Sequence, residues 1–266
     1  MIDTNTVWKD IENIRERAPL VHNITNYVVM NSTANALLAL GASPVMAHAS
    51  EEVEDMVGIA GALVINIGTL SGPWVNAMGK AAQAAKTRGI PIILDPVGAG
   101  ATALRTDTSL ALIQKGCPAV IRGNASEIRA LYSAEQETKG VDSRHSSEDA
   151  LEAAQQLSKQ LDAVVSVSGE VDVIVSGSQV VRTANGHPMM PRVTGLGCTA
   201  SALTGAFAAV NTNTLLAAAH AMAVMGIAGE MAAEKSSGPA SLQMHFLDAL
   251  YQMREEDIRT RIRIVA

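Results

Sequence analysis

Short apolar runs alternate with longer helical stretches along most of this chain, and this alternation constrains the fold more than any other feature. The clearest run, residues 62–67, is bounded by Gly61 and Gly68, as expected for a strand buried in a parallel sheet. A helical stretch with a stripe of small residues follows at 73–87. Repetition of this strand–helix unit predicts a three-layer α/β/α sandwich with a mainly parallel sheet.

The remaining elements are predicted from the same two patterns. Further strands are expected at 43–47, 90–94, 119–122 and 163–167, with a hairpin formed by 171–176 and 179–183. Further helices are expected at 5–17, 27–40, 103–114, 147–160, 198–210, 214–233 and 239–256, and another opens at 123–127. Ser50 is predicted to cap the helix that follows it, and the polar residues 136–146 are predicted to form a surface loop. Because no stretch resembles a linker and no repeat has a fixed period, we expect a single domain over residues 1–266.

The charge pattern argues against nucleic acid and membrane as partners. The net charge is −6, and the arginines near the C-terminus are interleaved with acidic residues. The first residues are polar and charged, unlike a signal peptide. The apolar run 215–233 contains His220 and Glu230, so we expect a buried or subunit-interface helix there instead of a membrane span. Two cysteines, Cys117 and Cys198, do not make a disulfide framework, which favours a reduced cytoplasm.

Residues 19–26 place four polar side chains between apolar ones: His22, Asn23, Thr25 and Asn26. Two interpretations are open, a loop with internally bonded side chains or a segment that faces a ligand. Histidine and asparagine together can hydrogen-bond a small polar ligand, which favours the second interpretation.

Two acidic residues follow predicted strands, and ligands of open parallel sheets bind beyond the carboxyl ends of the strands. These residues are Asp95 and Glu127. Mg²⁺ prefers carboxylate oxygens, water and phosphates as ligands, so the pair is predicted to bind a divalent metal ion. Taken singly, Asp95 could form a turn before Pro96, and Glu127 could complement a helix dipole.

The run Thr194-Gly-Leu-Gly-Cys198 opens a predicted helix of small residues at the same edge of the sheet. Gly195 and Gly197 let the backbone approach a ligand closely, and the first amides of a helix have no intrahelical partner. Together they predict an anion site with Cys198 at its mouth. The alternative is an ordinary glycine turn before a buried helix.

Several motifs resemble, in order and spacing, those of the hydroxyethylthiazole kinases of thiamine salvage, which belong to the ribokinase-like superfamily. They are Asp95-Pro-Val-Gly-Ala, Gly123-Asn-Ala-Ser-Glu127, Ser168-Gly-Glu-Val-Asp172 and Thr194-Gly-Leu-Gly-Cys198, preceded by Val21-His-Asn-Ile-Thr-Asn-Tyr27 and Gly41-Ala-Ser-Pro-Val-Met46. The resemblance extends from about residue 18 to about residue 250. It is specific, because the sugar kinases of the superfamily carry aspartate where this chain has Cys198.

The resemblance implies a ribokinase-like fold and transfer of the ATP γ-phosphoryl group to the hydroxyl of 4-methyl-5-(2-hydroxyethyl)thiazole. It also implies Mg²⁺ and a homotrimer with active sites between subunits. Met46 and Gly195 match the thiazole-contact positions of the family, and Arg122 and Ser168 match its ATP-contact positions. Asn124, at the same strand end as Arg122, is also expected to bind the nucleotide.

The segment with His22, Asn23 and Asn26 is expected to face the thiazole of the same or a neighbouring subunit. The amides from Gly195 to Cys198 are expected to hold the charge that develops on the γ-phosphoryl oxygens.

Cys198 is expected to lie beside the thiazole alcohol. A helix N-terminus lowers the pKa of a thiol, whereas the negative charge of ATP raises it, so the sequence leaves open whether Cys198 is a base. In a loose transition state the alcohol keeps its proton until late. We therefore interpret Cys198 as a residue that orients the alcohol and is at most a modest base.

Three other functions fit parts of the sequence. A related ATP- or ADP-dependent dehydratase acting on hydrated nicotinamide nucleotides would be expected to keep aspartate in place of Cys198. An acyl-transfer enzyme with Cys198 as nucleophile would need a nearby histidine and an orienting acid, which no motif marks. A non-enzymatic binding module would leave Asp95, Glu127 and Arg122 without a task.

Overall fold

The computed structural model of the protein describes residues 2–138 and 150–265. Within them, nine strands form one sheet in the order β2-β1-β3-β4-β5-β6-β7-β8-β9. The strands from β2 to β6 in this order run parallel, and β7, β8 and β9 are antiparallel to their neighbours. The strands are β1 (Leu20–Ile24), β2 (Ser43–Val45), β3 (Ala62–Asn66), β4 (Ile92–Asp95), β5 (Val120–Asn124), β6 (Val164–Ser168), β7 (Asp172–Ser176), β8 (Gln179–Thr183) and β9 (Ile264–Val265).

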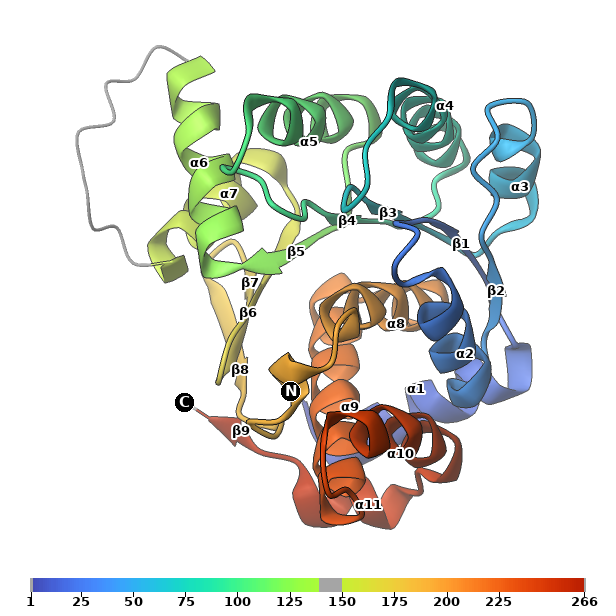
Figure 1. Cartoon of the computed structure of the whole chain (residues 1–266). Helices are drawn as coiled ribbons and strands as arrows, with labels where there is room; N and C mark the ends of the chain where they lie inside the picture. Colours follow the sequence, from blue (N-terminus) through green and yellow to red (C-terminus); the bar gives the residue numbers. More distant parts are fainter. Residues whose placement is uncertain (1, 139–149, 266) are drawn as a thin grey trace.

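Helices cover both faces of the sheet (Figure 1). One face carries α3 (Val53–Ile59), α4 (Gly72–Arg88), α5 (Ala103–Gly116), α6 (Ala125–Thr138) and α7 (Ala150–Leu161). The other face carries α1 (Thr4–Arg17), α2 (Met30–Leu40), α8 (Leu196–Val210) and α9 (Thr214–Glu234), with α10 (Pro239–Gln252) and α11 (Glu255–Arg261) outside α9. The three-layer α/β/α sandwich with a mainly parallel sheet is confirmed.

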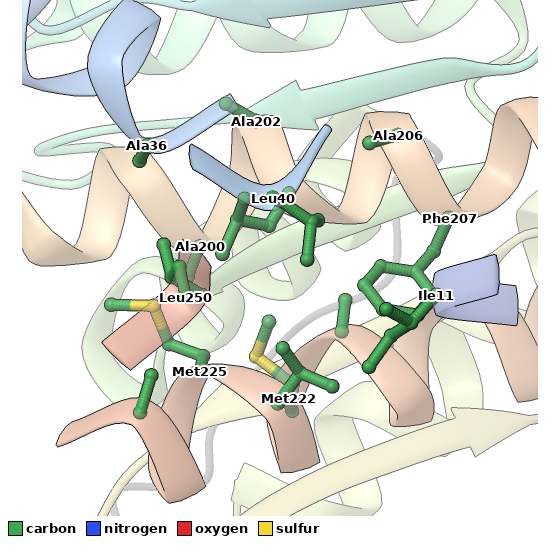
Figure 2. Packing of buried hydrophobic residues seen from close by; sticks show 14 of the residues in the cluster. Ile11, Ala36, Leu40, Ala200, Ala202, Ala206, Phe207, Met222, Met225 and Leu250 are labelled. Atoms are coloured by element: carbon green, nitrogen blue, oxygen red, sulfur yellow. The ribbon is translucent and has the colours of Figure 1, made fainter. Parts of the chain in front are cut away.

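The core on the α8 side is built from small and aliphatic residues around few aromatic rings. Phe207 of α8, Ile11 of α1 and Met222 of α9 lie together there (Figure 2). A Cβ atom on Gly205 of α8 would lie 2.7 Å from Val64 Cγ2 and 3.1 Å from Val21 Cγ1. Because this space is already filled, α8 is held directly against the middle of the sheet.

Among the described residues, one helix is long and apolar enough to cross a membrane by length and composition. That helix is α9, and 78% of the window concerned is buried within the fold. His220 on this helix is fully buried, with its Nδ1 2.7 Å from Asp10 Oδ2 of α1. The helix therefore belongs to the core, as its polar interruptions predict.

The main correction concerns residues 19–26, where the sequence predicts no strand and leaves open a loop or a ligand-facing segment. Residues 20–24 form β1, which lies between β2 and β3 and is buried from Val21 to Ile24. This strand carries polar residues in its centre, so it lacks the apolar pattern by which buried strands are predicted.

Other boundaries differ by a few residues. The helix expected at 27–40 begins at Met30, and the residue at the N-cap of α3 is Glu52 instead of Ser50. The single helix expected at 239–256 is divided at Met253 into α10 and α11. The start of the loop expected at 136–146 belongs to α6, which extends to Thr138. The rest of that loop, and the first residues of the helix expected at 147–160, lie outside the described residues.

The C-terminal residues bind the connection that leads from β8 toward α8. Asn185 lies in this connection, where its Nδ2 donates to Arg261 O at 2.7 Å and its Oδ1 accepts from Arg263 N at 2.9 Å. Glu230 of α9 accepts from Gly186 N at 2.8 Å. The end of the chain is thus an integral part of the sheet.

Candidate active site

Polar side chains form a row across the sheet on the face that α8 covers. Asn66 and Asp95, the last residues of β3 and β4, are register partners, and Arg122 of β5 is the partner of Ser166 of β6. All four are buried, with exposed fractions between 1% and 6%. The structure therefore brings together groups that the sequence only placed at the ends of separate strands.

The N-terminus of α8 lies over this row. Gly195 occupies the N-cap with φ +84°, a conformation that favours glycine, and a Cβ atom there would lie 2.6 Å from Val29 Cγ1. A Cβ atom on Gly197 would lie 3.8 Å from Arg122 Nη1, so the guanidinium of Arg122 sits beside the first turn of α8. The predicted glycine turn at a helix start is thus present, with a cation next to it.

Hydrogen bonds join the thiol of Cys198 to the carboxylate of Asp95. Asn26 Nδ2 lies 3.5 Å from Cys198 Sγ and 2.8 Å from Asn66 Oδ1. Asn66 Nδ2 then donates to Asp95 Oδ2 at 2.6 Å, and Ser201 Oγ donates to the same oxygen at 2.8 Å. The network thus joins the loop after β1, the ends of β3 and β4, and α8.

Burial controls the ionisation of both ends of this network. Loss of water raises the pKa of Asp95 to about 6, against the opposing effects of Arg122, Ser201 and Asn66. Burial and the nearby Asp95 raise the pKa of the Cys198 thiol, and the hydrogen bonds from Asn66 and Asn26 oppose the shift less strongly. At neutral pH Cys198 is therefore a thiol.

Arg122 is a buried cation with spare hydrogen-bonding capacity. Its Nη1 donates to Ser201 Oγ at 3.4 Å, and its Nε finds no partner among the described residues. A buried guanidinium that is not fully bonded beside a helix N-terminus is suited to bind an anionic oxygen.

Glu127 ties together the loops that follow β4 and β5. Its Oε1 accepts from Gly98 N and its Oε2 accepts from Asn124 N, both at 2.8 Å. Asn124 Oδ1 in turn accepts from Glu127 N at 2.9 Å and from Ser126 Oγ at 2.6 Å. Asn124 and Glu127 thus form a reciprocal cap at the start of α6.

The two predicted acids differ in how well they fit a metal ion. Both hydrogen bonds to Asp95 end on Oδ2, which leaves Oδ1 for another ligand, whereas each oxygen of Glu127 already accepts a backbone N–H. Within the part of the chain that the structure describes, no three residues among His, Cys, Asp and Glu gather to hold a metal. The donor set fits Mg²⁺ provided that phosphates and water supply most of its ligands.

The other predicted binding residues lie outside the hydrogen-bond network. His22 and Asn23 are fully buried in β1: His22 Nε2 lies 2.8 Å from Ala47 O, and Asn23 Nδ2 donates to Val21 O at 2.9 Å. Of the polar segment 22–26, only Asn26 reaches Cys198.

Met46 follows β2, and Ser168 is the last residue of β6. Met46 is half-buried, and Ser168 Oγ donates to Gly123 O at 3.3 Å. Ser168 is also the register partner of Asn124, which places these two predicted nucleotide contacts side by side.

Two residues of the network had no predicted role. Neither Asn66 nor Ser201 is among the residues that the sequence predicts for the site. Ser201 follows Cys198 by three positions on a predicted helix, which puts both on one face, and this spacing was the available signal. For Asn66 the hydrogen-bond pattern becomes visible only in three dimensions.

Comparison with solved structures identifies the class of protein to which this fold belongs. The fold matches that of a ribokinase-like superfamily protein from Enterococcus faecalis V583, with a TM-score of 0.63 at 15% identity over 94% of each chain. It matches the hydroxyethylthiazole kinase of Pyrococcus horikoshii OT3 more closely, with a TM-score of 0.91 at 45% identity over 98% of each chain. The fold is therefore that of a ribokinase-like kinase.

The sequence comparisons narrow this class. The chain is 65% identical over 266 residues to the hydroxyethylthiazole kinase of Syntrophus aciditrophicus (strain SB), a match that covers all of this chain and 98% of that protein. The model of the hydroxyethylthiazole kinase family matches residues 11–256. The chain belongs to the hydroxyethylthiazole kinase family.

Proposed function

We propose that the chain transfers the γ-phosphoryl group of ATP to the hydroxyl of 4-methyl-5-(2-hydroxyethyl)thiazole in thiamine salvage. It does so as a single domain, residues 1–266, in the cytoplasm. The observation that carries this proposal is the meeting of three groups at the start of α8: the glycine turn, the incompletely bonded cation Arg122 and the thiol of Cys198. A small alcohol at the thiol would face a phosphate bound to the turn.

Each residue has a task in this reaction. Phosphoryl transfer depends on positioning and charge stabilisation more than on covalent chemistry. The amides from Gly195 to Cys198 and the guanidinium of Arg122 stabilise the charge that develops on the γ-phosphoryl oxygens. Cys198 orients the alcohol and is at most a weak base, because its raised pKa keeps it protonated.

The nucleotide and the thiazole occupy neighbouring parts of the same edge. Ser168 and Asn124 contact the nucleotide beyond β5 and β6. Met46 and Gly195 contact the thiazole, together with Asn26. His22 and Asn23 support β1 beneath that subsite, since both side chains are buried in the strand.

Asp95 would hold Mg²⁺ through its Oδ1, with Glu127 as the second acid of the pair. When bound, the ion would supply positive charge that neutralises the phosphates. Glu127 also fixes the loop around Gly98 next to it, which keeps the phosphate side of the site in one shape.

The function is tested by measuring ATP consumption with Mg²⁺ against a panel of alcohols. We expect turnover with the thiazole alcohol, a phosphate monoester as product in ³¹P NMR, and much lower rates with pyrimidine alcohols and pyridoxal. Purified, folded protein that leaves the thiazole alcohol unphosphorylated would refute the proposal.

The same proposal includes a homotrimer whose active sites lie between subunits. Large apolar side chains are exposed on α2, on α10 and in the turn before α2, with exposed fractions of 68% for Val28, 58% for Leu38 and 56% for Met244. Such side chains suit a subunit contact near the glycine turn. Light scattering should give about three times the 27.7 kDa of the chain.

Replacement of Cys198 by aspartate should retain or raise turnover, because a carboxylate is a better-matched proton acceptor than a protonated thiol. Cys198→Ser should lose less activity than removal of Asp95. Steady-state kinetics with the thiazole alcohol measures both effects. Loss of nearly all activity in Cys198→Asp, with an unchanged circular dichroism spectrum, would contradict the orienting role.

A further inference from the structure

The amide of Asn66 has only one orientation that satisfies its neighbours. The backbone N–H of Gly68 can only donate, and it lies 2.9 Å from the Oδ1 of Asn66. The oxygen must therefore face Gly68, which directs Nδ2 toward Asp95 Oδ2 at 2.6 Å. With an exposed fraction of 1%, the side chain has no water to exchange for these bonds.

The same oxygen fixes the orientation of Asn26. Asn66 Oδ1 also accepts from Asn26 Nδ2 at 2.8 Å, so the nitrogen of that amide faces Asn66. The second hydrogen of this nitrogen is available to the sulfur of Cys198, 3.5 Å away. The orientation of the Asn66 amide thus directs an N–H of Asn26 toward Cys198. It also directs an N–H of Asn66 itself toward Asp95.

We propose that Asn66 is a positioning residue that couples the two halves of the active site: it holds Asp95 on the phosphate side and, through Asn26, Cys198 on the alcohol side. The inference rests on the proposed phosphoryl transfer. Asn66 acts on the reacting groups through Asp95, Asn26 and Cys198, so its effect on the reaction is indirect.

Ser201 provides a matched comparison. Its Oγ donates to the same Asp95 oxygen as Asn66 and lies 3.4 Å from Arg122, but it has no hydrogen bond to Asn26. Loss of Ser201 therefore disturbs the phosphate side alone, whereas loss of Asn66 disturbs both sides.

The test compares Asn66→Ala, Asn66→Asp and Ser201→Ala with the chain unmodified at these two positions. All four proteins carry Cys117→Ser, so that Cys198 is the single thiol. Asn66→Ala should lower kcat about 10–100-fold, as expected for a lost orientation, and raise KM for the alcohol several-fold. Ser201→Ala should lower kcat and raise KM for ATP, with KM for the alcohol unchanged. Asn66→Asp keeps an oxygen that accepts from Gly68 and Asn26, but it replaces the N–H that donates to Asp95 with a second oxygen. It should therefore lower kcat and leave KM for the alcohol unchanged.

A second readout is independent of the kinase reaction. The pH midpoint of iodoacetamide alkylation at Cys198, followed by mass spectrometry, should move upward in Asn66→Ala, because the thiolate loses the stabilisation that Asn66 provides both directly and by orienting Asn26. It should stay within experimental error in Ser201→Ala. This measurement remains informative if the thiazole alcohol is not the substrate, since an inactive unmodified chain refutes the proposed function and not the coupling.

Two results would overturn the inference. One is a folded Asn66→Ala variant whose kcat and alkylation midpoint equal those of the unmodified chain. The other is an Asn66→Ala variant that reproduces the Ser201→Ala pattern in every parameter. If Asn66→Ala does not fold, the Asn66→Asp variant decides, and an unchanged kcat in that variant also overturns the inference.

Discussion

Replacement of Asp95 by asparagine should remove most of the kinase activity and at the same time stabilise the folded protein. The variant loses the charged oxygen that we assign to Mg²⁺, and loss of one such electrostatic group lowers kcat by about 10²–10³-fold. Asparagine has nearly the same shape and can still accept from Asn66 and Ser201 through its oxygen. Kinetics with the thiazole alcohol and urea denaturation measure the two effects.

The gain in stability follows from the raised pKa of Asp95. Burial raises this pKa from 3.8 to about 6, so the folded chain binds the proton more tightly than the unfolded chain does. The resulting stabilisation is complete below the unfolded pKa and is lost as the pH rises through about 6. The difference of about two pH units corresponds to about 3 kcal/mol at neutral or higher pH, which the neutral asparagine does not lose.

The two proteins should therefore differ in stability by an amount that increases between pH 4 and pH 8. The comparison is made with chelator present and without nucleotide, because a bound metal would itself favour the ionised carboxylate. Glu54→Gln, on the exposed first turn of α3, is a control for removal of one acidic charge and should keep full activity. A stability difference that is the same at pH 4 and pH 8, or full turnover in Asp95→Asn, would contradict the assignment.

A single methyl group on Gly195 should lower kcat/KM by about 100-fold, as expected when a reacting group is displaced by about 1 Å. Alanine at φ +84° is strained by about 1–2 kcal/mol, and its Cβ would lie 2.6 Å from Val29 Cγ1. The turn must therefore move away from α2 and take the first amides of α8 with it. Steady-state kinetics with both substrates measures the loss.

The neighbouring valine allows the two causes to be separated. In the double variant Gly195→Ala/Val29→Ala the clash is gone and only the backbone strain remains, so part of the activity should return. Val29→Ala alone serves as the control for the truncated side chain. If the double variant is no better than Gly195→Ala, contact with Val29 does not set the position of the turn.

Much of the fold could be predicted because its central strands have the continuous apolar pattern that identifies a buried strand in a sequence. Residues 62–65 and 90–94 are apolar on both faces, which is the signature of central parallel strands. In β1 the central residues His22 and Asn23 are polar and buried, so the sequence pattern there indicates a loop or a ligand-facing segment instead of a strand. The two-residue β9 depends on pairing with β8 and on Asn185, which are contacts between distant segments.

The candidate site shows the same division. Asp95, Arg122 and Gly195 stand in motifs whose order along the chain predicts a common edge, and the structure places all three around the start of α8. Of the partners that orient them, only Ser201 has a signal in the sequence, its spacing from Cys198. Whether Asn66 faces Asp95 depends on the register between β3 and β4, and the sequence carries no local signal for that register.

The tight seat of α8 on the sheet has a consequence for catalysis. Since Gly205 leaves no gap above Val64 and Val21, the helix cannot move closer to the strands when substrates arrive. The dipoles at its first turn and the side chains beneath them are preorganised, so little energy is spent on rearranging them as the transition state forms.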